Sequence, residues 1–444
     1  MNYIKFIENK RINNVESGFE PTITCVELFD YQKDIVTWAC RRGKAAIFAD
    51  TGLGKTLMQI SWADQVNKKT NDPVLILAPL AVKEQTIKEG IKFGFDMTNI
   101  HVNNYDQLHN IDCSIYSGIV LDESSILKGE SSKTRKALIE EFKQTPYKLS
   151  CTATPSPNDY MELGTQSEFL DVMSQSEMLA MFFIHDGEDT SKWRLKGHGK
   201  KKFFEWMSVW SIYISKPSDL GYSDEGHGLH ELIYHEHIIE SGITDGLFAP
   251  IAQGLLERNK ARRDTVEVRA EQAAQIANGI DDQVLIWCHL NQEGDLLEKL
   301  IKESTQIAGR HTNQFKSDSM NKFTSGEIKK LISKPKLSGF GMNWQNCNQV
   351  IFIGLSDSWE SFYQAIRRCW RYGQKRSVHV HIVSSDIEGG VLLNIKRKEK
   401  INNELKREIM SIMKDKTISE LRKIKRDEVI DVDLVKMEMP LWVA

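Results

Sequence analysis

Short apolar runs recur along the chain, each ending at polar or turn residues and each separated from the next by a stretch with helical character. Four of these runs lie early in the chain, at residues 45–50, 74–79, 118–123 and 148–153. Four more lie late in the chain, at residues 284–289, 329–334, 350–354 and 378–384. Continuous apolar runs that alternate with helices are typical of parallel sheet that is buried on both faces. The pattern therefore predicts an α/β protein with two tandem parallel-sheet lobes.

The stretch between the two sets of strands differs from both in composition. It contains a basic and aromatic segment at residues 193–206, followed by a helix-like stretch rich in Arg, Glu and Ala. We predict four regions: an N-terminal lobe at residues 1–165, an insertion at residues 166–278, a second lobe at residues 279–390, and a charged C-terminal helix and tail at residues 391–444.

The C-terminal region carries an apolar stripe. Ile401, Leu405, Ile409 and Ile412 fall three or four positions apart, which places them on one face of a helix. Because this periodic stretch is short, a helix that packs on the second lobe is favoured over a coiled coil that binds a partner.

The composition is that of an ordinary globular protein, and 444 residues suggest about two or three domains. A formal net charge of −3 excludes a protein that coats nucleic acid by bulk charge, but it leaves room for local basic patches. No apolar run reaches the roughly 18 residues of a membrane span, and the N-terminus has no apolar core of signal-peptide length. The seven cysteines are scattered and form no Cys-x-x-Cys pair, which argues against a disulfide framework or a zinc ribbon and predicts a cytoplasmic protein.

The first candidate site is the sequence Ala-Asp-Thr-Gly-Leu-Gly-Lys-Thr at residues 49–56, a Walker A loop with Ala in place of the first Gly. It follows a predicted strand and precedes a predicted helix, the context in which such a loop holds nucleotide phosphates. Lys55 is predicted to reach the β- and γ-phosphates, and the Thr56 hydroxyl to hold Mg²⁺. The loop residues that are predicted to bind the cofactor with them are Thr51, Gly52, Leu53 and Gly54. The alternative is a chance glycine turn.

Two acidic residues, Asp122 and Glu123, close an apolar strand of the same lobe. Paired acids at such a position are costly unless a cation is nearby. Asp122 is predicted to position Mg²⁺ and Glu123 to orient the attacking water. The alternative is a solvated turn. Gln32, upstream of the loop, offers an amide that can read both edges of adenine, although a surface glutamine is an equally good interpretation.

The second lobe contributes two arginines. Arg368 and Arg371 are spaced i, i+3, so that on a helix they share one face and suit a phosphate whose charge must be neutralised during transfer. Arginines from a second lobe would make hydrolysis depend on lobe closure. The alternative is an ordinary basic helix. Trp344, in the preceding glycine-containing segment, is interpreted as a core residue rather than a base-stacking one.

The basic and aromatic segment offers a candidate contact with DNA. Lys196 and Lys200 would pair with phosphates, and the neighbouring aromatic residues could stack on bases. The alternative is a solvated lysine face over packed aromatic side chains. His235 and His237 share a face of a strand-like run, where ordinary surface histidines are favoured over a structural zinc site.

Together these segments resemble superfamily 2 helicases and translocases, closest to the Swi/Snf-type branch in its short phage and prophage form. The motifs occur in the family's order from Gln32 to Gln374. In that order they lie at Gln32 (Q motif) and at residues 49–56 (I), 75–86 (Ia), 121–125 (II), 150–159 (III), 285–297 (IV), 336–344 (V) and 364–374 (VI). Motif II departs from the family, because Ser124-Ser125 stands where relatives usually have Ala-His. The insertion is shorter than in chromatin remodellers, so nucleosome remodelling is not predicted.

The resemblance implies two RecA-like lobes with ATP in the cleft between them. The residues Gln32, Lys55, Thr56, Asp122, Glu123, Gln364, Arg368 and Arg371 would then form the ATP site. Thr152 and Thr154 would link the ATP site to the DNA track. The residues implied to contact nucleic acid in motifs Ia and V and nearby are Pro79, Lys83, Asn104, Lys336, Ser338, Gly339 and Asn343.

The sequence thus predicts an ATP-dependent DNA translocase or helicase that uses ATP and Mg²⁺. The resemblance places it in phage DNA replication or recombination, in the bacterial host cytoplasm. Its predicted partners are duplex, forked or branched DNA, with a nuclease or a replication or recombination protein as a further partner. An RNA helicase, or a nucleotide-gated DNA-binding subunit of a nuclease complex, remains an alternative at this point.

Overall fold

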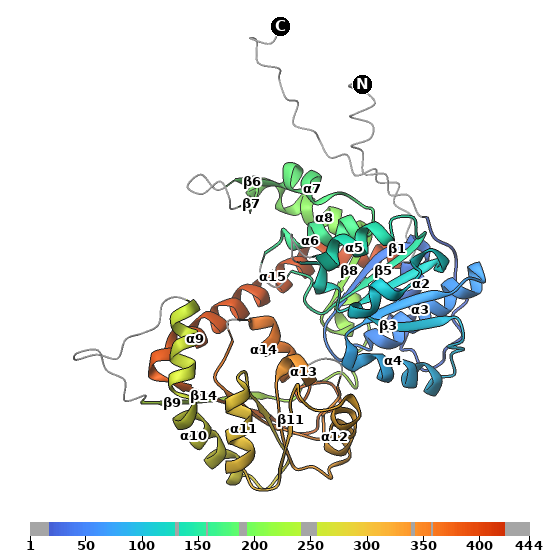
Figure 1. Cartoon of the computed structure of the whole chain (residues 1–444). Helices are drawn as coiled ribbons and strands as arrows, with labels where there is room; N and C mark the ends of the chain where they lie inside the picture. Colours follow the sequence, from blue (N-terminus) through green and yellow to red (C-terminus); the bar gives the residue numbers. More distant parts are fainter. Residues whose placement is uncertain are drawn as a thin grey trace, which may run out of the picture.

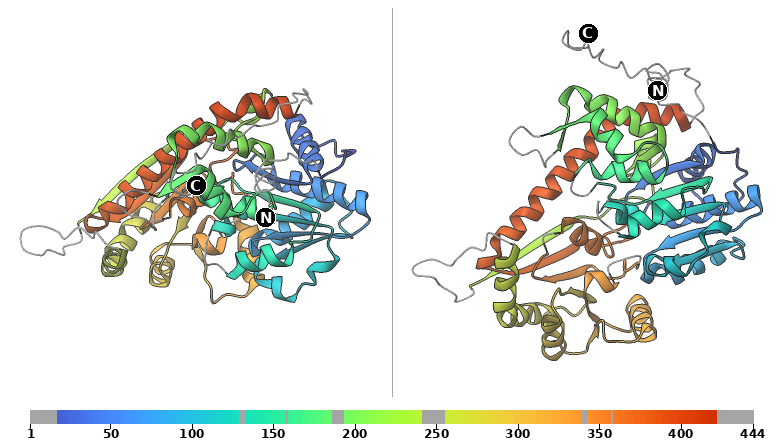
Figure 2. Two further views of the ribbon diagram at one scale, coloured as in Figure 1. Left: turned by 90° about the horizontal axis from the view of Figure 1, so that it is seen from above. Right: turned by 45° about the horizontal axis from the view of Figure 1, so that its top comes forward.

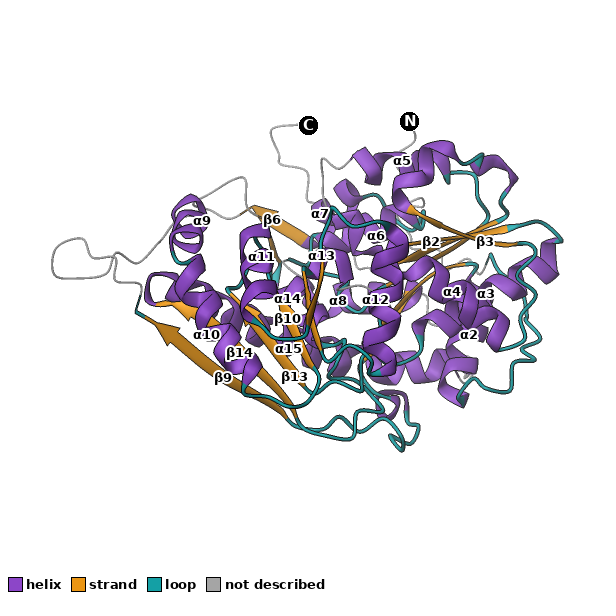
Figure 3. Ribbon diagram, turned by 60° about the horizontal axis from the view of Figure 1, so that its bottom comes forward, coloured by secondary structure: helices purple, strands orange, loops and turns teal. Residues whose placement is uncertain are grey.

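The computed structural model describes residues 17–128, 133–156, 159–185, 193–240, 255–338, 342–356 and 358–421. Two six-stranded sheets form the centres of two lobes, and helices cover both faces of each sheet (Figures 1 and 3). Every strand pair within these two sheets is parallel. The predicted α/β fold with two parallel-sheet lobes is confirmed.

The first sheet has the order β3-β2-β4-β5-β1-β8. Its strands are β1 (Lys44–Ala49), β2 (Val74–Ala78), β3 (Ile100–Asn104), β4 (Gly118–Asp122), β5 (Tyr147–Cys151) and β8 (Ser211–Ile214). The helices of this part of the chain are α2 (Asp30–Arg42), α3 (Lys55–Thr70), α4 (Leu80–Lys92), α5 (Lys133–Glu141), α6 (Glu162–Phe169), α7 (Gln175–Phe182) and α8 (Lys200–Trp210). A short antiparallel pair, β6 (Phe183–His185) and β7 (Trp193–Leu195), joins α7 to α8.

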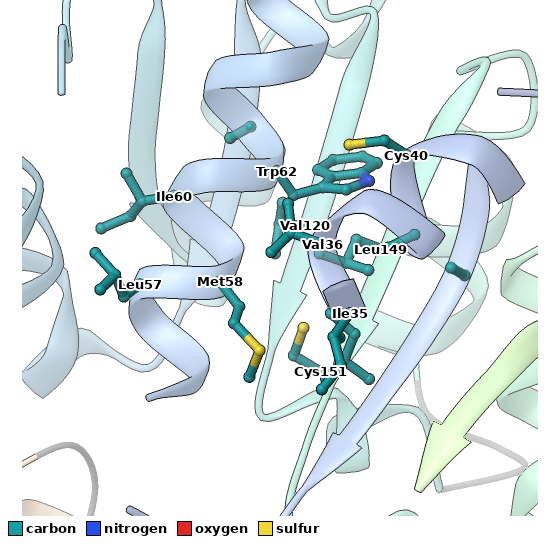
Figure 4. Close-up of a cluster of buried hydrophobic side chains, with 14 of the residues drawn as sticks. Ile35, Val36, Cys40, Leu57, Met58, Ile60, Trp62, Val120, Leu149 and Cys151 are labelled. Atoms are coloured by element: carbon teal, nitrogen blue, oxygen red, sulfur yellow. The ribbon is translucent and has the colours of Figure 1, made fainter. Parts of the chain in front are cut away.

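The core on one face of the first sheet is formed by α2 and α3. Figure 4 shows Cys40 of α2 and Trp62 of α3 beside Val120 and Leu149 of the central strands. All four side chains are fully buried. This packing fixes the positions of the loop before α3 and of the end of β4, both of which belong to the candidate site.

The second sheet has the order β11-β12-β10-β13-β14-β9. Its strands are β9 (Leu232–Ile239), β10 (Val284–Trp287), β11 (Ser304–Ile307), β12 (Lys330–Ser333), β13 (Gln349–Ile353) and β14 (Val378–Ser385). The helices of this part are α9 (Leu255–Asp264), α10 (Val266–Asn278), α11 (Asn291–Leu300), α12 (Asn313–Ser325), α13 (Pro335–Ser338), α14 (Trp359–Ile366) and α15 (Gly389–Leu421). Trp344 is fully buried in the core of this lobe, as predicted.

The structure divides the predicted insertion, residues 166–278, between the two lobes. Strand β8 pairs with β1 in the first sheet, and β9 pairs with β14 along eight residues of the second sheet. Both are edge strands, and the exposure of β9 alternates along its length, so β9 does not read as a continuous apolar run. Helix α10 packs through four alanines on α11 and the second sheet, so this lobe begins well before residue 279.

The C-terminal helix α15 bridges the lobes instead of packing only on the second. Val391 and Ile395, near its start, join the second-lobe core. Ile409 and Met413, further along, join the core of the first lobe, where α15 packs on α8. Between these regions Ile401 is 51% exposed. The helix is therefore too long for one lobe, and Figure 2 shows it running from the second lobe to the first. The predicted tail after residue 421 lies outside the described residues.

The histidines of β9 form a stack with those of β14. His235 Nε2 lies 2.9 Å from His379 Nδ1, and His237 Nε2 lies 3.1 Å from His381 Nδ1. Burial lowers the pKa of His235 and His237 below the ordinary value. No cluster of three or more potential metal ligands is found within the described residues. Of the helices that the structure describes, none combines the length and the apolar character that a membrane span requires.

Candidate nucleotide site between the lobes

A cavity of about 350 Å³ lies where motif segments of the two lobes face each other. The first lobe lines it with the loop after β1 and with the acidic pair that follows β4, and the second lobe lines it with arginines that follow α14. Ligands of open parallel sheets bind beyond the carboxyl ends of the strands, which is where β1 and β4 deliver these groups. The predicted residues that line the cavity are Gln32, Thr51, Gly52, Gly54, Lys55, Thr56, Asp122, Glu123, Arg368 and Arg371. The predicted residues Leu53 and Gln364 are buried elsewhere and do not line it.

The glycines of the loop are required by its shape. Gly52 has φ +92° and Gly54 has φ +74°, in the left-handed region that favours glycine. A side chain at Gly52 would also come within 2.7 Å of the ring of Tyr372 from the second lobe, and one at Gly54 would collide with the Gln32 amide. Lys55 Nζ donates to Ala49 O at 2.8 Å and to Asp50 O at 3.3 Å, so the ammonium group lies within the loop.

Gln32 connects α2 to this loop through one end of its amide and caps the start of α2 with the other. Nε2 donates to Leu53 O at 2.9 Å, and Oε1 accepts from Phe29 N at 2.9 Å. Each end of the amide makes one of the two hydrogen bonds it can form, so a donor and an acceptor remain for a ligand. The predicted contact of Gln32 with adenine stays a prediction.

Asp122 is buried, and Glu123 beside it is partly buried and has a strained backbone. Asp122 is the last residue of β4, and its Oδ1 accepts from Gln59 Nε2 at 2.7 Å. Glu123 has φ +50°, a backbone conformation that costs about 1 kcal/mol or more in a residue other than glycine and clusters at functional sites. Burial and the neighbouring Asp122 raise the pKa of Glu123 to about 7. Such a carboxyl group exchanges a proton near neutral pH.

The predicted arginines lie just beyond a helix rather than on one, because α14 ends at Ile366. Their Nη1 atoms nevertheless donate to the same carbonyl, Met342 O, each at 3.4 Å, so Arg368 and Arg371 remain adjacent and both line the cavity. Arg368 and Arg371 are therefore close together, as expected, but the turns that follow α14 place them there and not a shared helix face.

A third arginine, Arg367, contacts the phosphate-binding loop directly. Its guanidinium group donates to Thr51 Oγ1 and Thr51 O, and it lies 3.6 Å from Asp50 Oδ1. The sequence interpretation did not assign this residue, because the i, i+3 spacing drew attention to its two neighbours. The only signal for Arg367 in the sequence is its place directly before Arg368 in the same motif.

The electrostatics of the three arginines favour an anion in the cavity. Burial, together with the charges of Arg368 and Arg367, lowers the pKa of Arg371 to about 10. Arg371 Nε is buried and has no hydrogen-bond partner among the residues that the structure describes. A polyphosphate at this position would relieve the mutual repulsion and accept hydrogen bonds from the guanidinium groups.

Motif III connects this site to the second lobe. Thr152 Oγ1 lies 3.5 Å from Glu123 Oε2 and accepts from Thr154 N at 3.1 Å. Thr154 Oγ1 in turn donates to Glu360 Oε1 of α14 at 2.9 Å. Glu360 also forms an ion pair with Lys128, four residues beyond Ser124. Both threonines are fully buried, so they link the two lobes rather than lining a surface.

A second cavity, of about 520 Å³, adjoins the first between α4, α12 and α13. Three predicted nucleic-acid contacts line it, namely Pro79, Lys336 and Asn343. Lys88 and Lys316 add two further positive charges from opposite lobes. Both cavities are lined by Gln85, Glu89 and Lys92 of α4. We call this second cavity the basic groove.

Two further predicted nucleic-acid residues, Lys83 and Asn104, are not part of the lining of the basic groove. Lys83 Nζ donates to Asn103 Oδ1 at 3.0 Å, and Asn104 Oδ1 accepts from Gln107 N at 3.0 Å. Ser338 is the last residue of α13, and Gly339 lies outside the described residues.

The basic and aromatic segment is also separate from the basic groove. Phe203, Phe204 and Trp206 are fully buried in the first-lobe core and are not available to stack on bases. Lys196 Nζ donates to Met181 O at 2.9 Å, and Lys200 forms a 2.5 Å ion pair with Glu408 of α15. The aromatic side chains are therefore packed, as in the alternative interpretation, and phosphate contact by Lys196 and Lys200 stays a prediction.

The chain is similar to known helicases. Residues 269–373 match the helicase conserved C-terminal domain family. The "Uncharacterized ATP-dependent helicase YqhH" of Bacillus subtilis (strain 168) is 23% identical over 401 residues, covering 76% of this chain and 72% of the relative. "Putative protein p41" of Acyrthosiphon pisum secondary endosymbiont phage 1 is 23% identical over 465 residues, covering 86% of this chain and 98% of the relative. A solved structure, "Sulfolobus solfataricus SWI2/SNF2 ATPase core in complex with dsDNA", matches with 20% identity and a TM-score of 0.42 over 91% of this chain and 98% of its own.

The family match and the two relatives confirm the predicted resemblance to superfamily 2 helicases. The family match and the ATP-dependent helicase relative also bear out the prediction of an ATP-hydrolysing enzyme.

Proposed function

We propose that this chain is a DNA translocase or helicase that moves along DNA as it hydrolyses ATP between its two lobes. The proposal rests above all on one observation: the loop and acidic pair of the first lobe and the arginines of the second lobe line a single cavity. Neither lobe alone presents both sets of groups. Hydrolysis in such a site requires the lobes to be together, and its completion allows them to separate.

In this proposal the first lobe holds the nucleotide. Backbone N–H groups of residues 52–56 and the start of α3 bind the phosphates, and Lys55 neutralises them. Thr56 and Asp122 line the same cavity, and their hydroxyl and carboxylate oxygens suit Mg²⁺, which also takes phosphate oxygens as ligands. When bound, Mg²⁺ would neutralise charge that develops on the β- and γ-phosphates.

The chemical step is assigned to groups from both lobes. Glu123 orients the attacking water and takes up its proton. Arg368 and Arg371 donate to the transferring phosphoryl group, which carries its charge on peripheral oxygens. Motif III transmits the state of the site through Thr152, Thr154 and Glu360 to α14.

The basic groove is the proposed position of the DNA backbone. It combines lysines from α4, α12 and α13, so that opening and closing of the lobes would move one set of phosphate contacts relative to the other. The name of the helicase relative supports a nucleic-acid substrate, and the phage relative supports a phage setting, for which we propose DNA replication or recombination. A nuclease, or another replication or recombination protein, is the proposed partner.

The motor activity is tested by displacement of a third strand from triplex DNA, beside unwinding of a forked duplex. The chain is expected to displace the third strand only with ATP and Mg²⁺, and duplex DNA is expected to stimulate hydrolysis more than RNA does. Stimulation by RNA alone would favour an RNA helicase. Hydrolysis with DNA but without displacement or unwinding would favour the nuclease-complex subunit.

The raised pKa of Glu123 predicts a pH dependence. Below pH 7 the carboxyl group is mostly protonated and cannot accept a proton from water, so kcat/KM for ATP is expected to rise as pH increases through about 7 and then level off. The measurement is DNA-stimulated hydrolysis between pH 5.5 and pH 8.5 at low ATP. A flat profile across this range would contradict the assignment of Glu123 as the base.

A further inference from the structure

Lys406 of α15 reaches the phosphate-binding loop from the far end of the chain. Its Nζ lies 3.0 Å from Asp50 Oδ2, and the two side chains are only 13% and 12% exposed. An ion pair buried to this degree costs desolvation, which close geometry and additional hydrogen bonds must offset. No motif of the nucleotide site includes Lys406, and the sequence interpretation gave it no role.

The additional hydrogen bonds come from the second lobe. Tyr363 Oη donates to Asp50 Oδ1 at 2.7 Å, and Arg367, four residues further on, lies beside the same oxygen. Lys406 Nζ also lies 5.1 Å from the centre of the Tyr363 ring, within cation–π distance. Asp50 is thus held at once by the arginine-bearing segment and by α15. Burial raises the pKa of Asp50, but the charges of Lys406 and Arg367 outweigh burial and hold the pKa below its usual range.

Asp50 is also part of the loop that would hold the phosphates. Its Oδ1 accepts from Thr51 N at 2.7 Å, and its carbonyl accepts from Lys55 Nζ at 3.3 Å. Displacement of the Asp50 side chain would therefore shift the backbone next to Lys55. It would also release Tyr363 and the segment that carries Arg368 and Arg371.

We propose that Lys406 is a positioning residue for ATP hydrolysis, which acts through Asp50 to keep the phosphate-binding loop against the arginine-bearing segment of the second lobe. The inference rests on the proposed function of this cavity. It also assigns a function to α15, because this helix packs on both lobes and places the Lys406 ammonium group where the two lobes meet. Loss of the pair should impair the chemical step more than ATP binding, since the first lobe supplies most of the phosphate-binding groups.

The test is steady-state ATP hydrolysis by the full chain with saturating duplex DNA. Lys406→Ala is expected to lower kcat about tenfold and to change KM for ATP by no more than about twofold, because small displacements of catalytic groups slow chemistry. Lys406→Arg keeps the charge and should restore most of kcat. Asp50→Asn should lower kcat, and adding Lys406→Ala to it should cause little further loss. Lys400→Ala is the matched control, since Lys400 lies on the same helix, is 79% exposed and pairs with Glu404 at 4.0 Å.

Wild-type kcat in Lys406→Ala would overturn the proposal, as would equal proportional changes in kcat and KM. A loss of kcat that matches the unfolded fraction, measured by thermal unfolding, would also overturn it. If Lys406→Ala does not fold, Asp50→Asn decides: a lowered kcat at unchanged KM supports the proposal, and a wild-type kcat refutes it. A wild-type chain that does not hydrolyse ATP would instead refute the proposed function, and this inference with it.

Discussion

Glu123→Gln is expected to lower DNA-stimulated ATP hydrolysis by about 10²- to 10⁴-fold, the usual contribution of a positioned general base. Glutamine keeps the size and much of the polarity of the side chain but cannot take a proton from water. The strained backbone at φ +50° and the nearby Thr152 hydroxyl hold the carboxylate in one orientation, so another acid is poorly placed to substitute for it. Hydrolysis is measured by phosphate release, and nucleotide binding by titration with a fluorescent ATP analogue.

The binding titration separates a catalytic defect from a loss of the site. We expect nucleotide affinity to change by only a few-fold, because Lys55 and the loop remain intact. Glu271→Gln is the control, since Glu271 is exposed on α10. Hydrolysis by Glu123→Gln at the wild-type rate would refute the assignment of the acidic pair.

Arg371→Ala should lower hydrolysis by roughly 100-fold or more while leaving ATP binding nearly unchanged. The residue belongs to the second lobe, lines the cavity and has a buried Nε without a partner among the described residues. Its guanidinium group is therefore placed to bind an anion that is held by the first lobe. The same two assays measure the effect, with and without duplex DNA.

Arg376→Ala provides a matched control for Arg371→Ala. Arg376 lies five residues further on, is 44% exposed and pairs with Asp282, away from the cavity. The Arg376→Ala substitution should leave the rate of hydrolysis within about twofold of the wild type, because exposed ion pairs contribute little to stability. If Arg371→Ala reduced nucleotide affinity in proportion to rate, Arg371 would be a binding residue and its role in the transition state would be wrong.

The fully buried strands were predictable because burial on both faces leaves continuous apolar runs in the sequence. Strands β3, β8, β9 and β11 were not assigned as strands of either sheet. All four lie at sheet edges, and polar residues such as Asn103 in β3 and Glu236 in β9 interrupt the apolar run. Strand β8 is buried but only four residues long. Because β8 and β9 were not recognised, the sequence also did not show that residues 166–278 are divided between the two lobes.

In the site, the residues that carry local motifs were predictable, and those that join distant segments were not. The loop, the acidic pair, Arg368 and Arg371 each belong to a short pattern whose chemistry is defined by its neighbours. The Asp50–Lys406 pair joins residues 356 positions apart, and no periodicity or composition records it. Gln32 was also assigned from its motif and lines the cavity, and its contact with adenine stays a prediction.

The central claim is that ATP is hydrolysed only where arginines of the second lobe meet a nucleotide held by the first. Its most direct test is a structure of the chain with duplex DNA and ADP–aluminium fluoride, which resembles the transferring phosphoryl group. The account predicts guanidinium nitrogens of Arg368 and Arg371 within hydrogen-bond distance of the fluoride ligands. Both guanidinium groups turned away from an occupied phosphate-binding loop would contradict it.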